Sequence, residues 1–310
     1  MSNTYDVVIL GGGITGLSAG IYSVRAGLST LLIEQSIFGG QIINADVIEN
    51  FPGFPQGIAG PDLIMAVQEQ ASNFGLEYTF GQTQSLEVQQ RPMILRTDSD
   101  EFQANSIIIC AGGERNMLGV PGEEEFEGRG VSNCATCDGY FFADQDVLVV
   151  GGGDSAIDEG LYLTQICSKV TVVHRRDELR ASNVLQERAF KNSKMNFLYD
   201  SVVESINGGD AVSSIAVRNL KTNQSEEIAA TGIFIYAGYH PNTLPFQGTI
   251  PMDDGGHIKV DLNMATEVPG VFAAGDCRWH SARQLATGSG DGVTAALSAY
   301  AYLGGPDQSG

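Results

Sequence analysis

The feature that most constrains this chain is a strand–glycine–helix pattern that occurs twice. The first copy reads TYDVVILGGGITGLSAG, and the second reads QDVLVVGGGDSAIDEG. In each copy an apolar run of strand length leads into closely spaced glycines and then into a helical segment. This order is typical of the βαβ unit that binds a dinucleotide. A chain of 310 residues has room for about two domains. We therefore predict an α/β protein with two nucleotide-binding folds.

The glycines of the first copy stand in GxGxxG spacing. Gly11 permits the tight turn after the strand, Gly13 lets the backbone approach a pyrophosphate, and Gly16 lets the helix pack closely. Glu34 ends the next apolar run, about twenty residues on, where an acid binds a ribose hydroxyl. The alternative is a glycine-rich turn without a ligand, which the combination of strand, glycines, helix and acid disfavours.

The second copy differs at the end of its second strand. No acid stands there, and the chain continues as HRRDELR. A basic cluster in place of the acid favours the 2′-phosphate of NADP, although a solvated basic face is the alternative. The candidate residues are Gly151, Gly153, Asp154, Ser155, His174, Arg175, Arg176 and Arg180. Two dinucleotides in one chain suggest electron transfer from a nicotinamide to a flavin dinucleotide.

The segments around the two copies predict that one domain is inserted into the other. After each copy come a helix and several strand-like runs, so each domain is expected to be Rossmann-like, βαβ with a β-meander. The C-terminal tail does not continue the second copy, and we expect it to complete the first domain. The predicted domains are residues 1–117 with 248–310, and residues 118–247. Two crossings, near Leu118 and Gly248, would form a natural hinge.

Individual elements can also be placed. The expected helices are residues 17–26, 61–74, 155–167, 183–191 and 290–303. After the helix at residues 183–191 we expect strands near residues 196–199, 214–219, 226–228 and 232–236. Further strands are expected between residues 257 and 277.

Two cysteines lie close together in VSNCATCDGYFF, although the chain has only five. Cys134 and Cys137 are followed at once by Asp138. A reducing cytosol keeps thiols free, so a close pair there is more often catalytic or metal-binding than structural. A zinc site would need about two further ligands, and the remaining cysteines and histidines are scattered. Cys110, Cys167 and Cys277 are expected to be small buried residues.

The net charge of −20 argues against nucleic acid or an anionic membrane as a partner. No apolar run reaches the roughly 20 residues that cross a bilayer. The N-terminus, MSNTYDVVIL, has no basic region before its apolar stretch, so a secretory signal is not expected. The expected location is cytoplasmic.

Taken together, the motifs resemble those of low-molecular-weight thioredoxin reductases over essentially the full chain. The segments that carry the resemblance are GGGITGLSAGIY, FGGQI, VIENFPGFP, CATCDGYFF, GGGDSAIDEGLYL, HRRDELRAS, IYAGYHPNT, VFAAGDC and ARQLATGSGDG. CATCDG followed about forty residues later by HRRxxxRA is the most specific combination.

The resemblance implies FAD in the first domain and NADPH in the second. It adds to the FAD candidates Gly39, Gly40, Gln41, Asn50, Gly112, Asp276, Arg283 and Gln284. The chain departs from the family at CAGG, where many members read ATGA, and Arg115 is shifted by one position. Cys277, Trp279 and His280 have no family counterpart that we can interpret.

The resemblance also implies a mechanism. NADPH would reduce FAD, FAD would reduce the Cys134–Cys137 disulfide, and the dithiol would reduce a thioredoxin. It assigns Cys137 to the flavin side and Cys134 to the partner, with Asp138 as proton donor and acceptor. A rotation of the inserted domain would alternate the two half-reactions. The resemblance further implies a homodimer.

Three other functions remain open on the sequence. The chain could reduce a different protein disulfide, or it could take electrons from ferredoxin or another flavin instead of NADPH. It could also bind flavin without turnover, as a redox sensor. The intact HRRDELRA disfavours the second and the intact CATCD disfavours the third.

Overall fold

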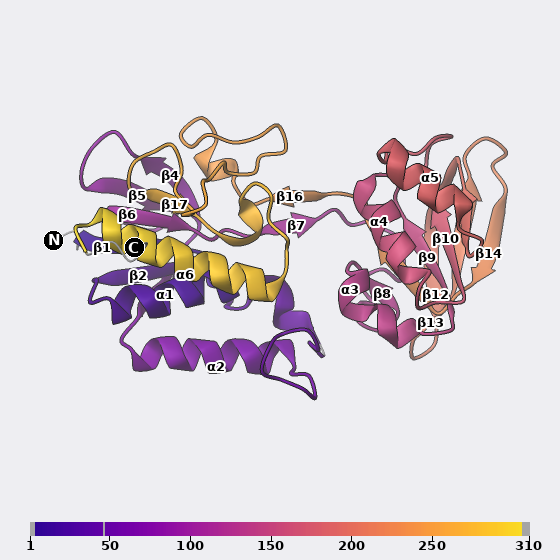
Figure 1. The fold of residues 1–310 in the computed structure, drawn as a ribbon, viewed down its shortest axis with the longest axis horizontal. Helices are drawn as coiled ribbons and strands as arrows, with labels where there is room; N and C mark the ends of the chain where they lie inside the picture. The colour runs from indigo at the N-terminus through magenta and orange to yellow at the C-terminus, as the bar shows by residue number, and fades with distance from the viewer. Residues whose placement is uncertain (1–3, 46, 306–310) are drawn as a thin grey trace. The chain divides into compact units, whose positions relative to one another are not determined.

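The computed structural model describes residues 4–45 and 47–305. The chain folds into two compact units (Figure 1). The first unit contains the chain up to Glu114 and again from His240, and the second unit contains Arg115–Tyr239. The boundaries at Arg115 and His240 lie three and eight residues before the crossings expected near Leu118 and Gly248. The reason is a two-stranded pairing of the connecting segments, β7 (Gly113–Arg115) with β16 (Tyr239–Pro241).

The first unit is built on a seven-stranded sheet in the order β3-β2-β1-β6-β5-β4, with β17 paired to β6. The central strands are parallel, and β5 is antiparallel to both β4 and β6. Its strands are β1 (Thr4–Leu10), β2 (Thr30–Glu34), β3 (Glu77–Phe80), β4 (Thr83–Glu87), β5 (Met93–Thr97), β6 (Glu101–Ile109) and β17 (Val271–Ala273). Its helical segments are α1 (Ile14–Arg25), η1 (Gly40–Asn44), α2 (Gly60–Asn73), η3 (Leu244–Phe246), η4 (Gly275–Cys277) and α6 (Leu285–Tyr302).

Helix α6 begins at Leu285, five residues before the expected start at 290. The glycines of LATGSGDG argue against a helix at these residues, because glycine is unfavourable in a helix interior. In the structure they allow α6 to lie against α1. A Cβ on Gly292 would stand 2.2 Å from the carbonyl oxygen of Thr15, and one on Gly288 would stand 2.7 Å from its hydroxyl. Tertiary packing therefore outweighs the local propensity.

The second unit has a five-stranded parallel sheet in the order β11-β10-β9-β15-β8 and a separate three-stranded antiparallel sheet, β12-β13-β14. The strands are β8 (Val131–Ser132), β9 (Asp146–Val150), β10 (Lys169–Val173), β11 (Met195–Leu198), β12 (Ser201–Gly208), β13 (Val212–Asn219), β14 (Ser225–Ala229) and β15 (Gly232–Ile235). The helical segments are α3 (Ala135–Asp138), η2 (Gly139–Phe142), α4 (Asp154–Leu163) and α5 (Asn183–Lys191). Each unit thus contains its own βαβ nucleotide-binding fold, and the predicted fold class is confirmed.

Strand β12 was not expected from the sequence. Its two well-buried apolar residues, Val203 and Ile206, are three positions apart, whereas an uninterrupted strand places inward residues two apart. The pairing with β13 shifts register between Val203 and Ser205. This β-bulge turns Val203 and Ile206 to the same side, and it conceals the alternation that identifies a strand.

Most of the strands expected between residues 257 and 277 are also absent from the described structure. Only β17 forms there, together with isolated bridges such as that between Ile258 and Arg278. Helix α4 ends at Leu163, four residues before its expected end at 167.

Candidate functional site

The first fingerprint has the shape that a dinucleotide requires. Gly11 has φ +107°, and a Cβ there would lie 2.3 Å from the carbonyl oxygen of Cys110. A Cβ on Gly16 would lie 1.8 Å from the carbonyl oxygen of Gly11, so the helix packs against the turn itself. A Cβ on Gly13 would meet nothing within 4 Å. The backbone is therefore closed on one side and open at Gly13, where a pyrophosphate would approach.

The carboxylate of Glu34 is held beside this turn. Its Oε2 accepts a 2.6 Å hydrogen bond from the amide of Gly12, and its Oε1 accepts a 3.0 Å bond from the amide of Ser36. Glu34 is the last residue of β2, so the strand end and the fingerprint are joined by the group expected to bind a ribose.

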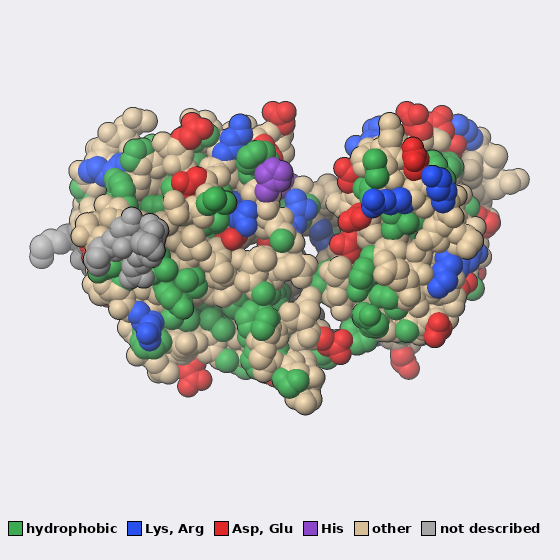
Figure 2. All heavy atoms as spheres, in the orientation of Figure 1, with side chains coloured by type: hydrophobic (Ala, Val, Ile, Leu, Met, Phe, Trp, Pro, Cys, Tyr) green, Lys and Arg blue, Asp and Glu red, His purple; other side chains and the backbone are tan. Residues whose placement is uncertain are grey.

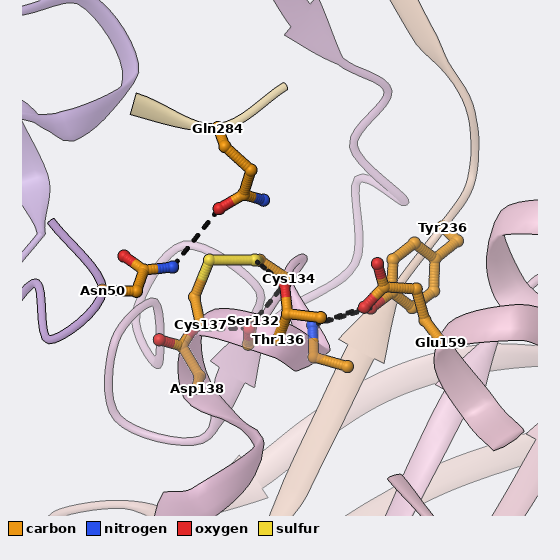
Figure 3. Close-up of a disulfide and its surroundings, with 10 residues drawn as sticks. Asn50, Ser132, Cys134, Thr136, Cys137, Asp138, Glu159, Tyr236 and Gln284 are labelled. Atoms are coloured by element: carbon orange, nitrogen blue, oxygen red, sulfur yellow. Dashed lines mark hydrogen bonds between the residues drawn. A yellow bond between two sulfur atoms is a disulfide. The ribbon is translucent and has the colours of Figure 1, made fainter. Parts of the chain in front are cut away.

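The other FAD candidates lie in the same unit, and several are linked to one another. The amide of Gly39 donates to the carbonyl oxygen of Gly12 at 3.1 Å, which brings the GGQ segment onto the first fingerprint. Gln41 donates from Nε2 to the carbonyl oxygen of Gly113 at 2.9 Å, beside Gly112. Asn50 donates from Nδ2 to Oε1 of Gln284 at 3.3 Å (Figure 3).

The Ala-Gly-Asp turn that carries Asp276 is fixed by a largely buried ion pair between Arg278 and Asp291, which was not expected from the sequence. Asp291 on α6 accepts from Nε of Arg278 at 2.6 Å, from its Nη2 at 3.0 Å, and from the amide of Gly275 at 3.1 Å. Ser281 donates to Asp276 at 3.4 Å. Arg283, the remaining flavin candidate, lies 3.3 Å from Nε2 of His257. Asp291 lies within the ARQLATGSGDG segment, but only the fold brings it to this turn, and sequence reasoning assigned it no role.

The second fingerprint is joined directly to the basic segment. The carbonyl oxygen of Gly152 accepts from the amides of Arg180 and Ala181, at 2.6 and 3.0 Å. Asp154 accepts from the amide of Ser182 at 2.6 Å. A Cβ on Gly153 would meet nothing within 4 Å, as at Gly13. The turn and the basic segment therefore form one surface of the second unit, with Ser155 in the first turn of α4.

His174 and the arginines are placed differently within this segment. The His174 side chain is buried, and its ring packs against the backbone of Gly152. A Cβ on Gly152 would stand only 2.4 Å from atoms of this ring. Burial lowers the pKa of His174, and the charges of the neighbouring arginines lower it further. Its Nε2 has no hydrogen-bond partner within the described part of the chain. The residues Arg175, Arg176 and Arg180 are exposed. This arrangement fits a phosphate bound by arginines at the edge of the fingerprint.

The cysteine pair lies at the start of a short helix in the second unit (Figure 3). Cys134 is the N-cap of α3, and it is joined to Cys137 by a disulfide. Ser132, on the preceding strand β8, donates from Oγ to Oδ2 of Asp138 at 2.6 Å, and it accepts from the amide of Cys134 at 3.2 Å. A single serine hydroxyl thus fixes the first cysteine and the acid relative to each other. Sequence reasoning did not identify Ser132.

A second carboxylate contacts the same helix from α4. Glu159 accepts a 2.9 Å hydrogen bond from the amide of Ala135, and it also accepts from the amide of Thr136. Tyr236 donates to Glu159 at 3.3 Å and accepts from the amide of Ala135 at 3.1 Å (Figure 3). Burial raises the pKa of Glu159 and that of Tyr236. Neither residue was expected from the sequence, because they come from α4 and from the chain just after β15.

The remaining three cysteines are free thiols and are buried, as expected: Cys110, Cys167 and Cys277. Burial raises the pKa of Cys167 to about 11 and that of Cys277 to about 12. A thiol must ionise to react, so these residues are poor nucleophiles in the folded protein.

Within residues 4–45 and 47–305, no group of three or more His, Cys, Asp or Glu side chains is arranged to hold a metal ion. Among the same residues, no helix is both long and apolar enough to cross a bilayer. The exposed surface carries acidic and basic side chains on both units (Figure 2).

Comparison with known proteins gives consistent results. Residues 5–296 match the family described as pyridine nucleotide-disulphide oxidoreductase. The chain is 45% identical over 300 residues to the thioredoxin reductase of Bacillus subtilis, covering 96% of this chain and 95% of that protein. It is 43% identical over 309 residues to the thioredoxin reductase of Peptoclostridium acidaminophilum, covering 98% of each. The crystal structure of the Streptococcus pyogenes thioredoxin reductase superposes with a TM-score of 0.93 at 45% identity, covering 98% of this chain and 99% of the other.

Proposed function

The chain belongs to the pyridine nucleotide-disulphide oxidoreductase family, within the thioredoxin reductases, and from this premise we propose how its residues carry out the reaction. The enzyme is a flavoprotein that takes electrons from NADPH and reduces the disulfide of a thioredoxin. The observation that carries the assignment to particular residues is the Cys134–Cys137 disulfide, with the carboxylate of Asp138 held beside it by Ser132.

FAD is assigned to the first unit and NADPH to the second. Gly11, Gly13, Gly16 and Glu34 would hold the pyrophosphate and adenosine ribose of FAD, because the turn is open at Gly13 and Glu34 is fixed beside it. Arg175, Arg176 and Arg180 would bind the 2′-phosphate of NADPH, because arginine suits phosphate and these side chains are exposed. When bound, the flavin accepts a hydride from the nicotinamide and delivers two electrons to sulfur.

The thiol chemistry belongs to Cys134, Cys137 and Asp138, which lie within one five-residue segment. Reduction of the disulfide leaves Cys137 and Cys134 as thiols, and one of the two protons needed is supplied through Asp138. Cys134 then attacks the partner disulfide as a thiolate, forming a mixed disulfide and releasing one partner thiol. Cys137 attacks Cys134 in turn, which re-forms the enzyme disulfide and releases the second partner thiol. Asp138 is placed to accept and return protons in both steps.

The positions of the cofactor and cysteine sites in the chain require that the second unit moves between the two half-reactions. The NADPH candidates and the cysteine pair are both in the second unit, whereas the FAD candidates are in the first. Both must reach one flavin, and two chain segments connect the units. We propose that the second unit rotates on β7 and β16, so that nicotinamide and disulfide meet the flavin in turn.

The partner is a thioredoxin, and the exposed aromatic side chains after the cysteine pair suit such a contact. Tyr140 is 69% exposed and Phe141 is 52% exposed. Exposed aromatic residues are enriched at protein interfaces. We also propose a homodimer and a cytoplasmic location. Reduction of a different carrier protein is the alternative.

An anaerobic titration tests the proposed electron path. The oxidised holoenzyme is titrated with NADPH and separately with NADH, while the flavin absorbance is followed, and oxidised thioredoxin is then added. We expect rapid bleaching by NADPH, slow bleaching by NADH, and recovery of the colour on addition of thioredoxin. Bleaching without recovery would contradict thioredoxin as the acceptor. No bleaching by either nicotinamide would contradict NADPH as the donor.

A further inference from the structure

We propose that Glu159 is a positioning residue that occupies the amide donors next to Cys134, and thereby keeps the Cys134–Cys137 pair strongly reducing. This inference rests on the proposed function and concerns the same cysteine pair. It adds a second carboxylate with a task different from that of Asp138. Glu159 transfers no proton in the reaction but determines how well the protein stabilises the Cys134 thiolate.

The hydrogen bonds around α3 carry the inference. Cys134 is the N-cap residue of this helix, so the amides of Ala135 and Thr136 are donors without a partner inside the helix. Such amides usually stabilise a thiolate at the same end of the helix, and this lowers the pKa of the cysteine. Here both amides donate to the carboxylate of Glu159, at 2.9 Å for Ala135.

Tyr236 completes this arrangement from the other side. Its hydroxyl accepts from the amide of Ala135 at 3.1 Å and donates to Glu159 at 3.3 Å (Figure 3). The two amides and the phenol stabilise the charged form of Glu159, and burial opposes it. The carboxylate is therefore anchored at three points and is fixed beside the first turn of α3.

Other charged groups lie near this carboxylate, but none of the residues that the structure describes forms an ion pair with it. Asp158, the preceding residue, adds a second negative charge that raises the pKa of Glu159. Arg188 on α5 lines the same open cavity of about 460 Å³, together with Thr136 and Tyr162. Asp138 lies close enough to raise the pKa of Tyr236. The first turn of α3 is thus flanked by carboxylates.

The consequence concerns the reduced state of the pair. The negative charge of Glu159 makes the Cys134 thiolate less stable by repulsion. Its hydrogen bonds with the amides of Ala135 and Thr136 also leave these donors unavailable to the thiolate. A dithiol whose thiolate is poorly stabilised is a stronger reductant, whereas strong thiolate stabilisation makes a disulfide oxidising. An enzyme that must pass electrons to the disulfide of another protein benefits from a poorly stabilised thiolate, because its dithiol is then the stronger reductant.

The test replaces Glu159 by glutamine and measures the acidity of Cys134. Cys137→Ser is introduced into both forms, so that Cys134 is the only cysteine that is not buried. The rate of alkylation by iodoacetamide is measured against pH in the FAD-loaded enzyme. We expect the midpoint of the profile to fall by about one pH unit in Glu159→Gln, because one partly buried charge is removed and the amides are released. Asp158→Asn is the matched control, since it removes an exposed carboxylate one residue away, and its midpoint should move much less.

A second readout uses the intact cysteine pair. The disulfide is equilibrated with mixtures of reduced and oxidised dithiothreitol, and the fraction reduced is measured. We expect the equilibrium to shift about tenfold toward the dithiol in Glu159→Gln, equivalent to about 30 mV. Glu159→Asp retains the negative charge but places it farther from the amides. It should therefore shift the dithiol–disulfide equilibrium in the same direction by a smaller amount. It also serves as the test if Glu159→Gln does not fold.

The outcomes separate this inference from the proposed function. If both midpoint and equilibrium are unchanged in Glu159→Gln, while NADPH still reduces the flavin and thioredoxin still reoxidises it, the role of Glu159 is wrong and the function stands. A shift toward the disulfide would also overturn the inference. If the unmodified enzyme fails to reduce thioredoxin, the function is wrong whatever the midpoint of Cys134.

Discussion

The hydroxyl of Ser132 lies 2.6 Å from the carboxylate of Asp138, and it is the donor of the hydrogen bond between them. The same oxygen accepts from the amide of Cys134 at 3.2 Å. One small side chain therefore connects the acid to the first cysteine. The position of Asp138 follows from β8 and α3 together, and not from its place in the CATCD motif alone.

Replacement of Ser132 by alanine should slow the thiol–disulfide half-reaction. Loss of a hydrogen bond to a charged group costs roughly 1.5–3 kcal/mol, so we expect a rate of thioredoxin reduction that is about 10- to 100-fold lower. Asp138→Asn should cost more, about 10²- to 10⁴-fold, because it removes the proton-transfer group itself. Stopped-flow measurement of flavin reduction by NADPH should show no change in either variant. Ser213→Ala, on the exposed face of β13, is the control; equal effects of Ser132→Ala and Ser213→Ala would argue against the hydrogen bond.

The two cysteines should be distinguishable by trapping. In Cys137→Ser, the Cys134 thiol can attack a thioredoxin disulfide, but no second thiol resolves the product, so a stable mixed disulfide should accumulate. In Cys134→Ser, little adduct should form. Non-reducing electrophoresis and intact mass measure the adduct. An adduct found mainly with Cys134→Ser would show that the roles of the two cysteines are exchanged.

The basic segment should determine the choice of nicotinamide. Arg175→Ala combined with Arg176→Ala removes two exposed cations expected to bind the 2′-phosphate. We expect the KM for NADPH to rise at least about 100-fold, since each of the two charged hydrogen bonds contributes roughly 1.5–3 kcal/mol. The KM for NADH should stay unchanged, because NADH lacks that phosphate. Arg188→Ala on α5 serves as the control for loss of a cation. A parallel rise for both nucleotides would contradict the assignment.

The buried thiol of Cys277 should make the protein less stable at alkaline pH. Its pKa is raised from 9.0 to about 12 by burial, so above pH 9 the unfolded chain loses a proton that the folded chain retains. Stability therefore falls as pH rises through this window, by about 1.4 kcal/mol at pH 10. Urea unfolding of the oxidised enzyme at pH 8 and pH 10 measures the loss. In Cys277→Ala the loss between the two pH values should be smaller by about this amount; an identical loss would contradict the role of this thiol.

The sequence predicted the repeated βαβ pattern and the cysteine motif because these are local signals. Glycine spacing, strand-length apolar runs and the CATCD segment can be read within short windows. The start of α6 could not be predicted in this way, because its glycines are compatible with a helix only through their contact with Thr15 of α1. Strand β12 was missed because a bulge near Glu204 breaks its alternation.

The same distinction holds for the site. Cys134, Cys137 and Asp138 lie within one five-residue segment of the chain and were found together. Ser132, Glu159 and Tyr236 come from β8, from α4 and from the chain after β15, and they meet only in the folded unit. No spacing in the sequence relates Glu159 to Ala135, which is 24 positions away. Groups that adjust the chemistry of a motif often lie outside it, and the structure is needed to identify them.

The most direct test of the account counts thiols on thioredoxin after a single encounter with the reduced enzyme. The holoenzyme is reduced anaerobically with NADPH, excess nucleotide is removed, and an equal amount of oxidised thioredoxin is added before an acid quench and alkylation. We predict two new thiols on each thioredoxin with the unmodified enzyme. We predict none with the Cys134→Ser, Cys137→Ser double variant, even though NADPH still bleaches its flavin. Equal yields of thioredoxin thiols from the two enzymes would show that electrons bypass the cysteine pair, and would contradict the account.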